Sequence, residues 1–463
     1  MWGNWEFQVS TRIQFGWGSA SKLAQMLREW GRRVFWIGYQ NPGALANIYK
    51  NLRCQLRQAD LMVEEFFEVV GEPDVALVNR AAEAARSFCP ELILAIGGGS
   101  VLDTAKAVAA LARREGRLEE YLPLPTGTGL MDPQPTIGTS ASAMEQGQTT
   151  GPATSMRQTP VRVSTSARPM DQALPIIAVP TTAGTGSEVT SLAVFHWQDP
   201  AGDEMPMKLT LASKALLPKV AVVDPALSAS CPPELTARCA ADALAHAIEA
   251  SMSRRTSPLV QLLAEEAVVQ IFTHLPVVLT QPIDRRAREG LALAALLAGI
   301  ALQQAGATLA HAMAHALGAL TGLPHGLAVA ICTLTALHYN LPEVIPLAAR
   351  WASRLGLAGQ HQEHLAQAFL DRLHQLFQQA GLPQGIKLPE WSTSNHPKVP
   401  ADLVLCLPQK LPEPACDWTG LLAQNAFQST SVALKLNPRK ITQDSLAILF
   451  RQILLPMKGP AAG

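Results

Sequence analysis

Three of the chain's 11 histidines lie close together, in the stretch HAMAHALGALTGLPHG at positions 311–326. His311 and His315 are four residues apart in a helical pattern, so their side chains leave one face of a helix with Cβ atoms roughly 5–6 Å apart. His325 follows in a Pro-His-Gly sequence typical of a loop, which could bring a third imidazole back to the helix. One metal could bind both helical histidines, or one histidine could bind the metal while its neighbour faces a substrate.

A second pair of reactive side chains, Asp242 and His246, occurs in AADALAHAIEA, again four residues apart on a helical pattern. A carboxylate with several imidazoles suits Fe²⁺ or Zn²⁺ and is too rich in nitrogen for Mg²⁺ or Ca²⁺. A single histidine on an apolar helix is more often a core residue than a ligand, but two such pairs together favour a metal site. HxxxH lacks the glutamate of HExxH, which argues against a zinc protease of that type.

Two glycine-containing turns follow apolar runs that predict buried strands. LILAIGGGSVLDTAKAVA passes through Gly97, Gly98 and Gly99 to Ser100 and then into a helix, whose amino terminus offers N–H donors to a pyrophosphate. PIIAVPTTAGTGSEVT repeats this order with hydroxyls and amides at 181–187 that could hold phosphate or ribose. Either turn alone is consistent with a tight turn that binds nothing, and neither matches GxGxxG or the Walker A lysine loop.

The elements that must position these residues fall into two classes along the 463-residue chain, which is long enough for two or three units. Up to about residue 190, runs such as RRVFWIG and PIIAVPTT alternate with helical stretches, the βαβ pattern of a parallel sheet covered by helices. Beyond about residue 232 the pattern is almost wholly helical. We therefore predict an α/β domain over residues 1–190, with a parallel sheet and flanking helices, and an all-α domain over residues 191–463.

Residues 125–172 interrupt the first of these domains. They are rich in Ser, Thr, Gly, Pro and Gln and contain few large apolar side chains. Such a segment buries too little surface to offset the entropy cost of ordering. We predict a disordered insertion, with a docking or targeting element as the alternative.

Composition narrows the partners and the location. The formal net charge is zero and 48% of residues are hydrophobic, so the charge indicates neither nucleic acid nor a strongly acidic substrate, and a small neutral ligand fits better. Seven scattered cysteines without CxxC indicate free thiols in a reducing, cytoplasmic environment. The amino terminus lacks a signal peptide pattern, and no uninterrupted apolar run reaches the ~18 residues of a membrane-spanning helix.

Taken together and in order, the motifs resemble those of the iron-containing (group III) alcohol dehydrogenases. The shared stretches include VSTRIQFGWGSASKL, GGGSVLDTAKAVA, PTTAGTGSEVT, AADALAHAIEA, HAMAHALGALTGLPHGLAVA and LNPRKITQDSLAILF. The resemblance covers nearly the whole chain except about 125–172, and it is greatest to the branch associated with ethanolamine and propanediol utilisation.

The resemblance implies a dinucleotide bound in the cleft between the α/β domain and the all-α domain, beside a divalent metal. Its metal ligands correspond to Asp242, His246, His311 and His325. His315 corresponds to a histidine near the nicotinamide and the substrate, not on the metal. The residues that correspond to cofactor contacts are Gly97, Gly98, Gly99, Ser100 and Asp103 in the first turn and helix, Thr181, Thr182 and Thr185 in the second turn, and Lys208.

The implied activity is hydride transfer between a nicotinamide and a short-chain primary alcohol or aldehyde. The expected cofactors are NAD and Fe²⁺, with NADP and Zn²⁺ as alternatives. The metal would act as a Lewis acid on the alcohol or carbonyl oxygen, and His315 would orient the substrate or relay its proton. A homo-oligomer and an association with a bacterial microcompartment are further implications of the resemblance.

Three positions depart from the family pattern. Where many members end the second strand with an aspartate that contacts the adenosine ribose, this chain has Tyr39, and the lack of an acid there leaves NADP open. Glu72 replaces an asparagine in the PNP motif, and GATL with Thr308 replaces GLGL before the histidine pair. The positions of the four ligands are unaffected.

Two functions of other classes are the alternatives. A lyase similar to dehydroquinate synthase would also combine a dinucleotide with a metal, but it would need a different ligand pattern and a strongly basic substrate pocket. A non-catalytic microcompartment component would not need to keep all four ligand positions. We therefore predict a metal-dependent, NAD(P)-linked alcohol dehydrogenase.

Overall fold

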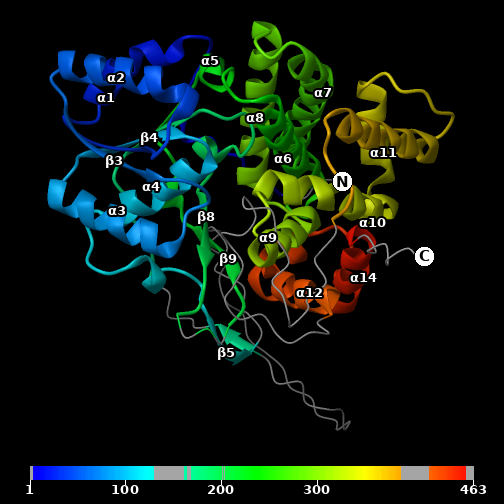
Figure 1. The fold of residues 1–463 in the computed structure, drawn as a ribbon. Coiled ribbons are helices and arrows are strands. Elements are labelled where there is room, and N and C mark those ends of the chain that lie inside the picture. Colours follow the sequence, from blue (N-terminus) through cyan, green and yellow to red (C-terminus); the bar gives the residue numbers. More distant parts are fainter. Residues whose placement is uncertain are drawn as a thin grey trace, which may run out of the picture.

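The computed structural model divides into an α/β region and a helical region that lie side by side (Figure 1). It describes residues 4–129, 161–163, 168–200, 202, 204–386 and 417–454. The α/β region runs from the blue start of the chain into its green part, and the helices from α6 onward form the other half (Figure 1).

Six parallel strands form the main sheet, in the spatial order β1-β10-β7-β4-β2-β3. Their bounds are β1 Arg12–Phe15, β2 Arg33–Tyr39, β3 Met62–Val69, β4 Leu92–Gly97, β7 Ile176–Pro180 and β10 Val220–Val223. The central strands β4, β7 and β10 are buried at every residue, as expected of a parallel sheet covered on both faces. The parallel sheet with flanking helices is therefore confirmed.

Alternate residues of each strand supply two separate cores. On one face, Val34 and Trp36 pack with helices α1 (Leu23–Arg28) and α2 (Ala46–Gln58). On the other face, Phe35 and Ile37 pack with α3 (Val75–Phe88) and α4 (Gly99–Leu111). The period of two along the strand thus fixes which side chains face which pair of helices.

The strand order reverses between β2 and β4, because the chain moves from β2 outward to β3 and then returns to the other side of β2. In open parallel sheets, ligands bind in the crevice at the carboxyl ends of the strands beside such a reversal. Here β2 ends at Tyr39 and β4 ends at Gly97. The first predicted glycine turn therefore starts at the reversal of the sheet.

Strands continue beyond residue 190. β8 (Leu192–Trp197) and β9 (Met207–Ala212) form an antiparallel pair, and β10 joins the main sheet between β1 and β7. The division between residues 190 and 191 stays a prediction, but the sheet extends to Val223. The short apolar run VAVV is a buried strand, and Asp224 then caps the first helix of the second half.

The helical half is built around α6, which packs against α7, α8 and α10. Almost every residue of α6 from Thr236 onward is buried, because its alanines let neighbouring helices approach closely. The helices of this half are α5 Pro225–Ser228, α6 Pro233–Met252, α7 Pro258–Thr280, α8 Arg285–Ala305, α9 Leu309–Thr321, α10 His325–Arg354, α11 Gln362–Gln379, α12 Trp418–Ser429, α13 Ser431–Leu436 and α14 Gln443–Ile453. Short 3-10 helices lie at Ser19–Lys22, Gly43–Leu45, Leu118–Glu120, Ser187–Val189 and Lys214–Leu216.

Two of these helices, α7 and α10, are long and apolar enough to cross a membrane, and so is the bent pair of α8 and α9 if it is counted as one span. In this fold, 44% of the most apolar stretch of α7 and 56% of that of α10 are buried inside the protein. The absence of a membrane-spanning segment stays a prediction.

A few residues of the predicted insertion belong to the part of the chain that the structure describes. Within it, β5 (Pro125–Gly129) and β6 (Val161–Val163) pair in an antiparallel ribbon, and Met170 is buried in the core beside α4. The prediction of a disordered insertion over 125–172 stays a prediction. Residues 130–160 and 164–167 lie outside the described residues.

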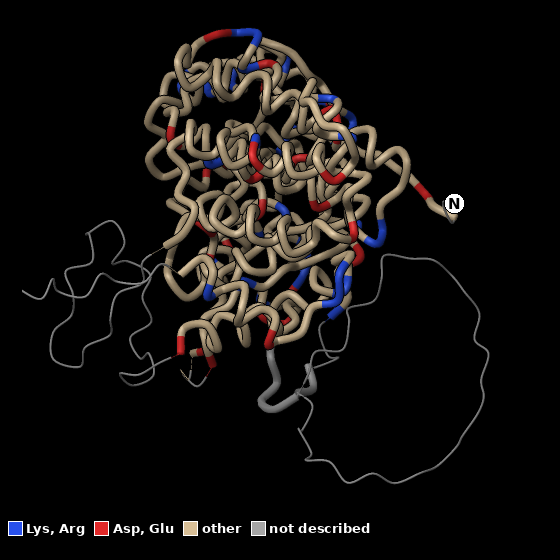
Figure 2. Tube along the Cα trace, turned by 90° about the vertical axis from the view of Figure 1, so that its right-hand side faces the viewer, with Lys and Arg blue, Asp and Glu red and all other residues tan. Residues whose placement is uncertain are grey.

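Charged residues of both signs are interspersed over the fold in the view of Figure 2. This agrees with the equal numbers of basic and acidic residues, 37 of each. The five cysteines within the described residues, Cys54, Cys89, Cys231, Cys239 and Cys332, are free.

Candidate functional site

Three helices bring the predicted metal ligands together. Asp242 and His246 lie one turn apart on α6, His311 lies in the first turn of α9, and His325 is the first residue of α10. The interpretation of His325 as a loop residue was therefore wrong. Pro324 immediately precedes α10, and proline is favoured at helix starts because it has no N–H to satisfy.

Two glycines allow α10 to begin close to α6. Gly322 ends α9 with a φ of 69°, a left-handed conformation that glycine adopts without steric cost. Gly326 lies against α6, where an added Cβ would be only 2.6 Å from the carbonyl oxygen of Arg238. The start of α10 can therefore approach α6 closely enough for His325 to face Asp242.

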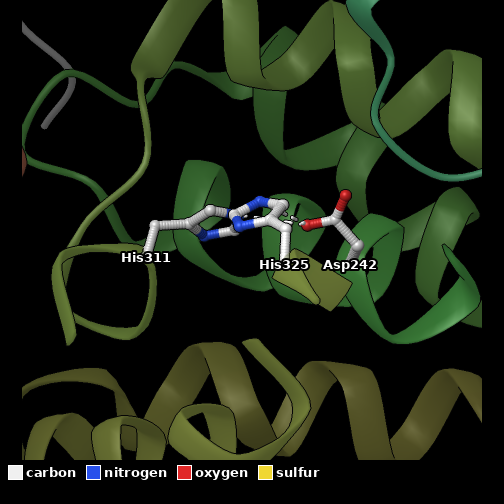
Figure 3. A group of neighbouring side chains, drawn as sticks. All are labelled: Asp242, His311 and His325. Carbon is white, nitrogen blue, oxygen red and sulfur yellow. Dashed lines mark hydrogen bonds and ion pairs between the residues drawn. The ribbon is translucent and has the colours of Figure 1, made fainter. Parts of the chain in front are cut away.

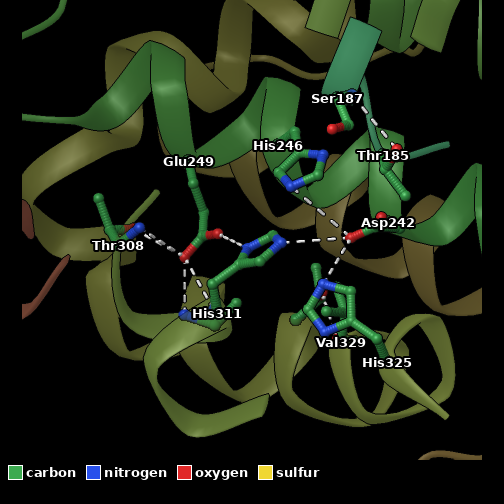
Figure 4. Close-up of polar contacts among 11 residues, drawn as sticks. Thr185, Ser187, Asp242, His246, Glu249, Thr308, His311, His325 and Val329 are labelled. Carbon is green, nitrogen blue, oxygen red and sulfur yellow. Dashed lines mark hydrogen bonds and ion pairs between the residues drawn. The ribbon is translucent and has the colours of Figure 1, made fainter. Parts of the chain in front are cut away.

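The imidazoles converge on one oxygen, Oδ1 of Asp242. Its distances are 3.2 Å to Nε2 of His311, 3.5 Å to Nε2 of His325 and 3.7 Å to Nε2 of His246. Figure 3 shows Asp242, His311 and His325 pointing toward one another, and Figure 4 adds His246, whose ring stacks on that of His311. One potential ligand atom each from Asp242, His311 and His325 lie within 4.8 Å of one another. This spacing is suited to a single cation.

Burial and charge shift the pKa values in this cluster. Burial by itself would raise the pKa of Asp242, but His246 and His325 hold that pKa well below its usual range. Burial lowers the pKa of His246 to about 4. Burial would also lower the pKa of His311, but Glu249 and Asp242 raise it to about 10. An ionised carboxylate surrounded by imidazoles is thus in place for a cation.

Sequence reasoning missed Glu249, which is 1% exposed and bonded to Nδ1 of His311. It lies on α6 at spacings of seven residues from Asp242 and three from His246, so all three side chains share one face of the helix. Figure 4 shows it on the side of His311 opposite Asp242. A third polar residue in helical register within the apolar run AADALAHAIEA was the signal that could have identified it.

His315, the predicted catalytic residue, lies next to this cluster. Its ring centroid is 5.6 Å from that of His325. Burial, with His325 and Lys208 nearby, holds its pKa well below the usual range, so the ring is neutral. Its Nδ1 is buried and has no hydrogen-bond partner among the described residues.

Lys208, predicted to contact the cofactor, belongs to a second charged group near His315. Its Nζ, in a side chain 1% exposed, lies 2.5 Å from Oε2 of Glu72, which also contacts Nε2 of His196 at 2.7 Å. Burial by itself would raise the pKa of Glu72, but Lys208 and His196 hold it well below its usual range. Glu72, which replaces the family's asparagine, therefore places an ionised carboxylate beside Lys208. The sequence alone did not identify His196 as part of this group.

The two glycine turns lie side by side at the carboxyl ends of β4 and β7. Gly97 pairs with Pro180, and the N–H of Thr181 donates to the carbonyl of Gly97 at 3.0 Å. Gly98 precedes α4, and the amides of Gly99 and Ser100 in its first turn have no partner in the described part of the chain. These amides are the free donors of a helix amino terminus.

The threonines of the second turn lie over the first turn. A Cβ on Gly98 would lie 3.2 Å from Oγ1 of Thr182, and one on Gly99 would lie 2.8 Å from Cγ2 of Thr185. A Cβ on Gly184 would lie 2.9 Å from Cβ of Cys239, one turn before Asp242 on α6. The second turn therefore packs on the helix that carries the metal ligands.

Tyr39 reaches the glycine turn with its hydroxyl. The N–H of Gly98 donates to Tyr39 Oη at 3.0 Å, and the N–H of Tyr39 donates to Tyr49 Oη at 3.2 Å. Burial raises the pKa of Tyr39, so the hydroxyl keeps its hydrogen. The structure thus gives Tyr39 a partner in the pyrophosphate turn, while the expected position at the adenosine ribose stays a prediction.

Asp103, another predicted cofactor contact, is bonded within the protein. Its Oδ1 accepts from the hydroxyl of Ser187 at 2.7 Å, and its Oδ2 accepts from the N–H of Val194 at 2.9 Å. Lys106, fully buried, donates to Ser187 at 2.7 Å. These bonds tie α4 to the second turn and β8, and the cofactor contact of Asp103 stays a prediction.

Sequence and structure comparisons agree with this arrangement. Residues 10–225 match the profile of the iron-containing alcohol dehydrogenases, and residues 236–407 match the C-terminal profile of the Fe-containing alcohol dehydrogenase family. The 1-propanol dehydrogenase PduQ of Salmonella typhimurium is 27% identical over 453 residues, which are 97% of this chain and 99% of that protein. The NADPH-dependent butanol dehydrogenase of Clostridium saccharobutylicum is 30% identical over 72% of this chain and 74% of that protein.

Among solved structures, a 1,3-propanediol oxidoreductase has a TM-score of 0.76 and 25% identity, and the match covers 98% of this chain and 100% of that one. Its fold matches both the parallel sheet and the helical half. Together with the profile matches and the order of the motifs, this shows that the chain belongs to the iron-containing alcohol dehydrogenase family.

Proposed function

We propose that the four converging side chains of α6, α9 and α10 hold the catalytic divalent metal of this NAD(P)-linked alcohol dehydrogenase. The ligands are Asp242, His246, His311 and His325. The observation that carries the proposal is the convergence of three imidazoles on one carboxylate oxygen in a buried position. Three nitrogens and one oxygen fit Fe²⁺ or Zn²⁺, and the buried Nδ1 of His246 lacks a hydrogen-bond partner among the described residues.

The metal and the nicotinamide would supply the reactive chemistry, and the protein would hold and orient them. When bound, the metal supplies Lewis acidity to the alcohol oxygen and the nicotinamide supplies the hydride acceptor. The free amides of Gly99 and Ser100, at the positive end of α4, would hold the pyrophosphate. The hydroxyls of Thr182 and Thr185 lie across the same turn and would line the other side of the dinucleotide.

We assign the substrate end of the site to His315. A neutral imidazole has one N–H donor and one lone pair, so it can hold the hydroxyl of an alcohol and move its proton. The free Nδ1 of His315 suits this role. The ion pair of Lys208 and Glu72 lies near enough to affect the pKa of His315, and we place it at the nicotinamide end of the cleft.

The substrate class that we propose is a short-chain primary alcohol and its aldehyde. The related propanol and butanol dehydrogenases support this choice. An association with a microcompartment, a cytoplasmic location and a homo-oligomeric state remain predictions from the resemblance. We propose that the protein accepts either NAD or NADP, because Tyr39 stands where many family members have an aspartate and so no carboxylate is present at that position.

The test is a spectrophotometric screen of short aldehydes with NADH and NADPH, after reconstitution with Fe²⁺ without oxygen. We expect oxidation of the nicotinamide with at least one straight-chain aldehyde, and a loss of this activity in Asp242→Asn. Activity that survives Asp242→Asn would contradict the metal site. No turnover of any alcohol or aldehyde by the reconstituted protein would instead favour a non-catalytic function.

A further inference from the structure

The carboxylate of Glu249 has two oxygens with different surroundings. Oε1 accepts from the N–H and the hydroxyl of Thr308, at 3.2 and 2.9 Å, and from the N–H of Ala310 at 2.7 Å. The N–H of His311 also points to it at 3.4 Å. Among the described residues, Oε2 is bonded only to Nδ1 of His311. Figure 4 shows Glu249 between the start of α9 and the His311 ring.

An ionised carboxylate accepts hydrogen bonds and cannot donate them. The ring nitrogen of His311 that faces Oε2 must therefore carry a hydrogen. The other ring nitrogen, Nε2, faces Oδ1 of Asp242 in the ligand cluster, where a bound metal would take the place of its hydrogen. Which nitrogen of a histidine binds a metal is set by the hydrogen bond that the other nitrogen makes.

We propose that Glu249 is a positioning residue that fixes a hydrogen on Nδ1 of His311 and keeps Nε2 available to the metal. This inference rests on the metal role proposed above for His311. Glu249 is carried by the same helix as Asp242 and His246. A single rigid element thus presents two ligands and also sets the orientation of a third ligand on another helix.

The donors of α9 prevent Glu249 from turning. Thr308 precedes α9 and gives it no side-chain cap, so Oε1 of Glu249 satisfies the amides at the start of the helix instead. Rotating the carboxylate away would leave buried donors without a partner, which is unfavourable. Thr308 is also a departure from the family pattern, where GLGL has glycine, and its hydroxyl adds one donor to this set.

Glu249→Gln makes the role of these donors testable, because an amide has one accepting and one donating end. The accepting oxygen of Gln must face Thr308 and Ala310, so its NH₂ must face Nδ1 of His311. Nδ1 then has to accept, and the ring hydrogen moves to Nε2, where it blocks metal binding. We expect the Kd for Zn²⁺ to rise by about 10- to 100-fold, as for other residues that orient metal-bound histidines.

The experiment combines zinc titration with NMR of the full-length protein labelled with ¹⁵N-histidine. Long-range ¹H–¹⁵N spectra distinguish a ring nitrogen that carries hydrogen from one with a lone pair, and the His311 signals are identified by their loss in His311→Gln. In the wild type, Nδ1 should carry hydrogen with and without zinc. In metal-free Glu249→Gln, Nδ1 should have a lone pair.

Thr308→Val is the matched control, because it removes one donor to Oε1 and leaves the carboxylate against His311. It should keep the hydrogen on Nδ1 and change the zinc Kd by less than about fivefold, the effect of one neutral hydrogen bond. A lone pair on Nδ1 in the wild type, or a zinc Kd in Glu249→Gln equal to that of the wild type, would overturn the inference. Normal zinc binding by His311→Gln would instead overturn the metal site itself.

Discussion

The metal half and the dinucleotide half of the proposed site are built from different parts of the chain. On the metal side, three imidazoles meet one carboxylate oxygen at 3.2 to 3.7 Å, and every ligand is a side chain. On the dinucleotide side, the backbone amides of Gly99 and Ser100 have no partner among the described residues, while Asp103 is hydrogen-bonded and Lys208 is ion-paired to protein groups. A side-chain site is broken by removing atoms, and a backbone site is broken by adding them.

The largest effect should come from removing a metal ligand. His246→Ala or His311→Ala should lose the bound metal and lower kcat/KM by about a thousandfold or more, because Lewis-acid stabilisation is worth several kcal/mol and each 1.36 kcal/mol is tenfold in rate. Metal analysis and aldehyde turnover check this. His338→Ala, an exposed histidine of α10, is the control. Metal content near the wild-type level in either ligand variant would refute the assignment.

Adding atoms at the glycine turn should break the other half alone. In Gly98→Val, the new Cβ would lie 2.8 Å from Tyr39 Oη and 3.2 Å from Thr182 Oγ1, so either Tyr39 or the turn must shift. Losing one or two hydrogen bonds to a charged phosphate should raise the Kd of NADH by roughly 10- to 100-fold. Calorimetric titration measures this Kd. Metal content should stay unchanged, and a parallel loss of metal would show that the two halves are not independent.

A pH experiment tests the buried carboxyl group of Glu188, which follows the second glycine turn. Burial raises the pKa of Glu188, which is 3% exposed, to about 7. Since the pKa in the fold lies above that of the unfolded chain, the neutral carboxyl stabilises the fold fully at low pH, and this contribution is lost as pH rises through about 7. Glu188→Gln cannot ionise, so its stability relative to the wild type should improve by on the order of 2 kcal/mol between about pH 5 and pH 8.

Urea unfolding of both proteins at the two pH values checks this prediction for Glu188. The comparison cancels the contributions of other carboxylates, such as Asp242, whose pKa is lowered and whose effect has the opposite sign. A constant difference between Glu188→Gln and the wild type would mean that Glu188 is already ionised in the fold at low pH.

The smallest expected effect concerns Tyr39. Because its hydroxyl bonds to Gly98, Tyr39→Phe should raise the Kd values of NADH and NADPH by the same factor, about two- to tenfold for one hydrogen bond. Titrations with both dinucleotides measure the ratio. Tyr39→Asp is the complementary variant, since an acid facing the ribose would weaken NADPH selectively. A change in the ratio for Tyr39→Phe would place Tyr39 at the ribose and not at the turn.

Local patterns were sufficient where one element carries the chemistry. The spacing of Asp242 and His246 predicts a shared helix face because an α-helix repeats every 3.6 residues, and the structure has both on α6. The apolar runs predicted the parallel sheet, and GGGS predicted the strand-to-helix turn at β4 and α4. Composition did not indicate the pairing of β5 with β6 inside residues 125–172, because strand pairing with a distant partner leaves little trace in composition.

The sequence by itself determined the fold class from its apolar patterns and the positions of the two glycine turns from the strand ends. The four candidate ligands came from the resemblance to the family, because spacing alone did not separate them from His315. Only the tertiary structure decided that His325 begins α10 beside α6, that Glu249 orients His311, and that Tyr39 bonds to Gly98. These contacts join residues 59 to 83 positions apart. Their geometry depends on how helices and strands pack, which no local period encodes.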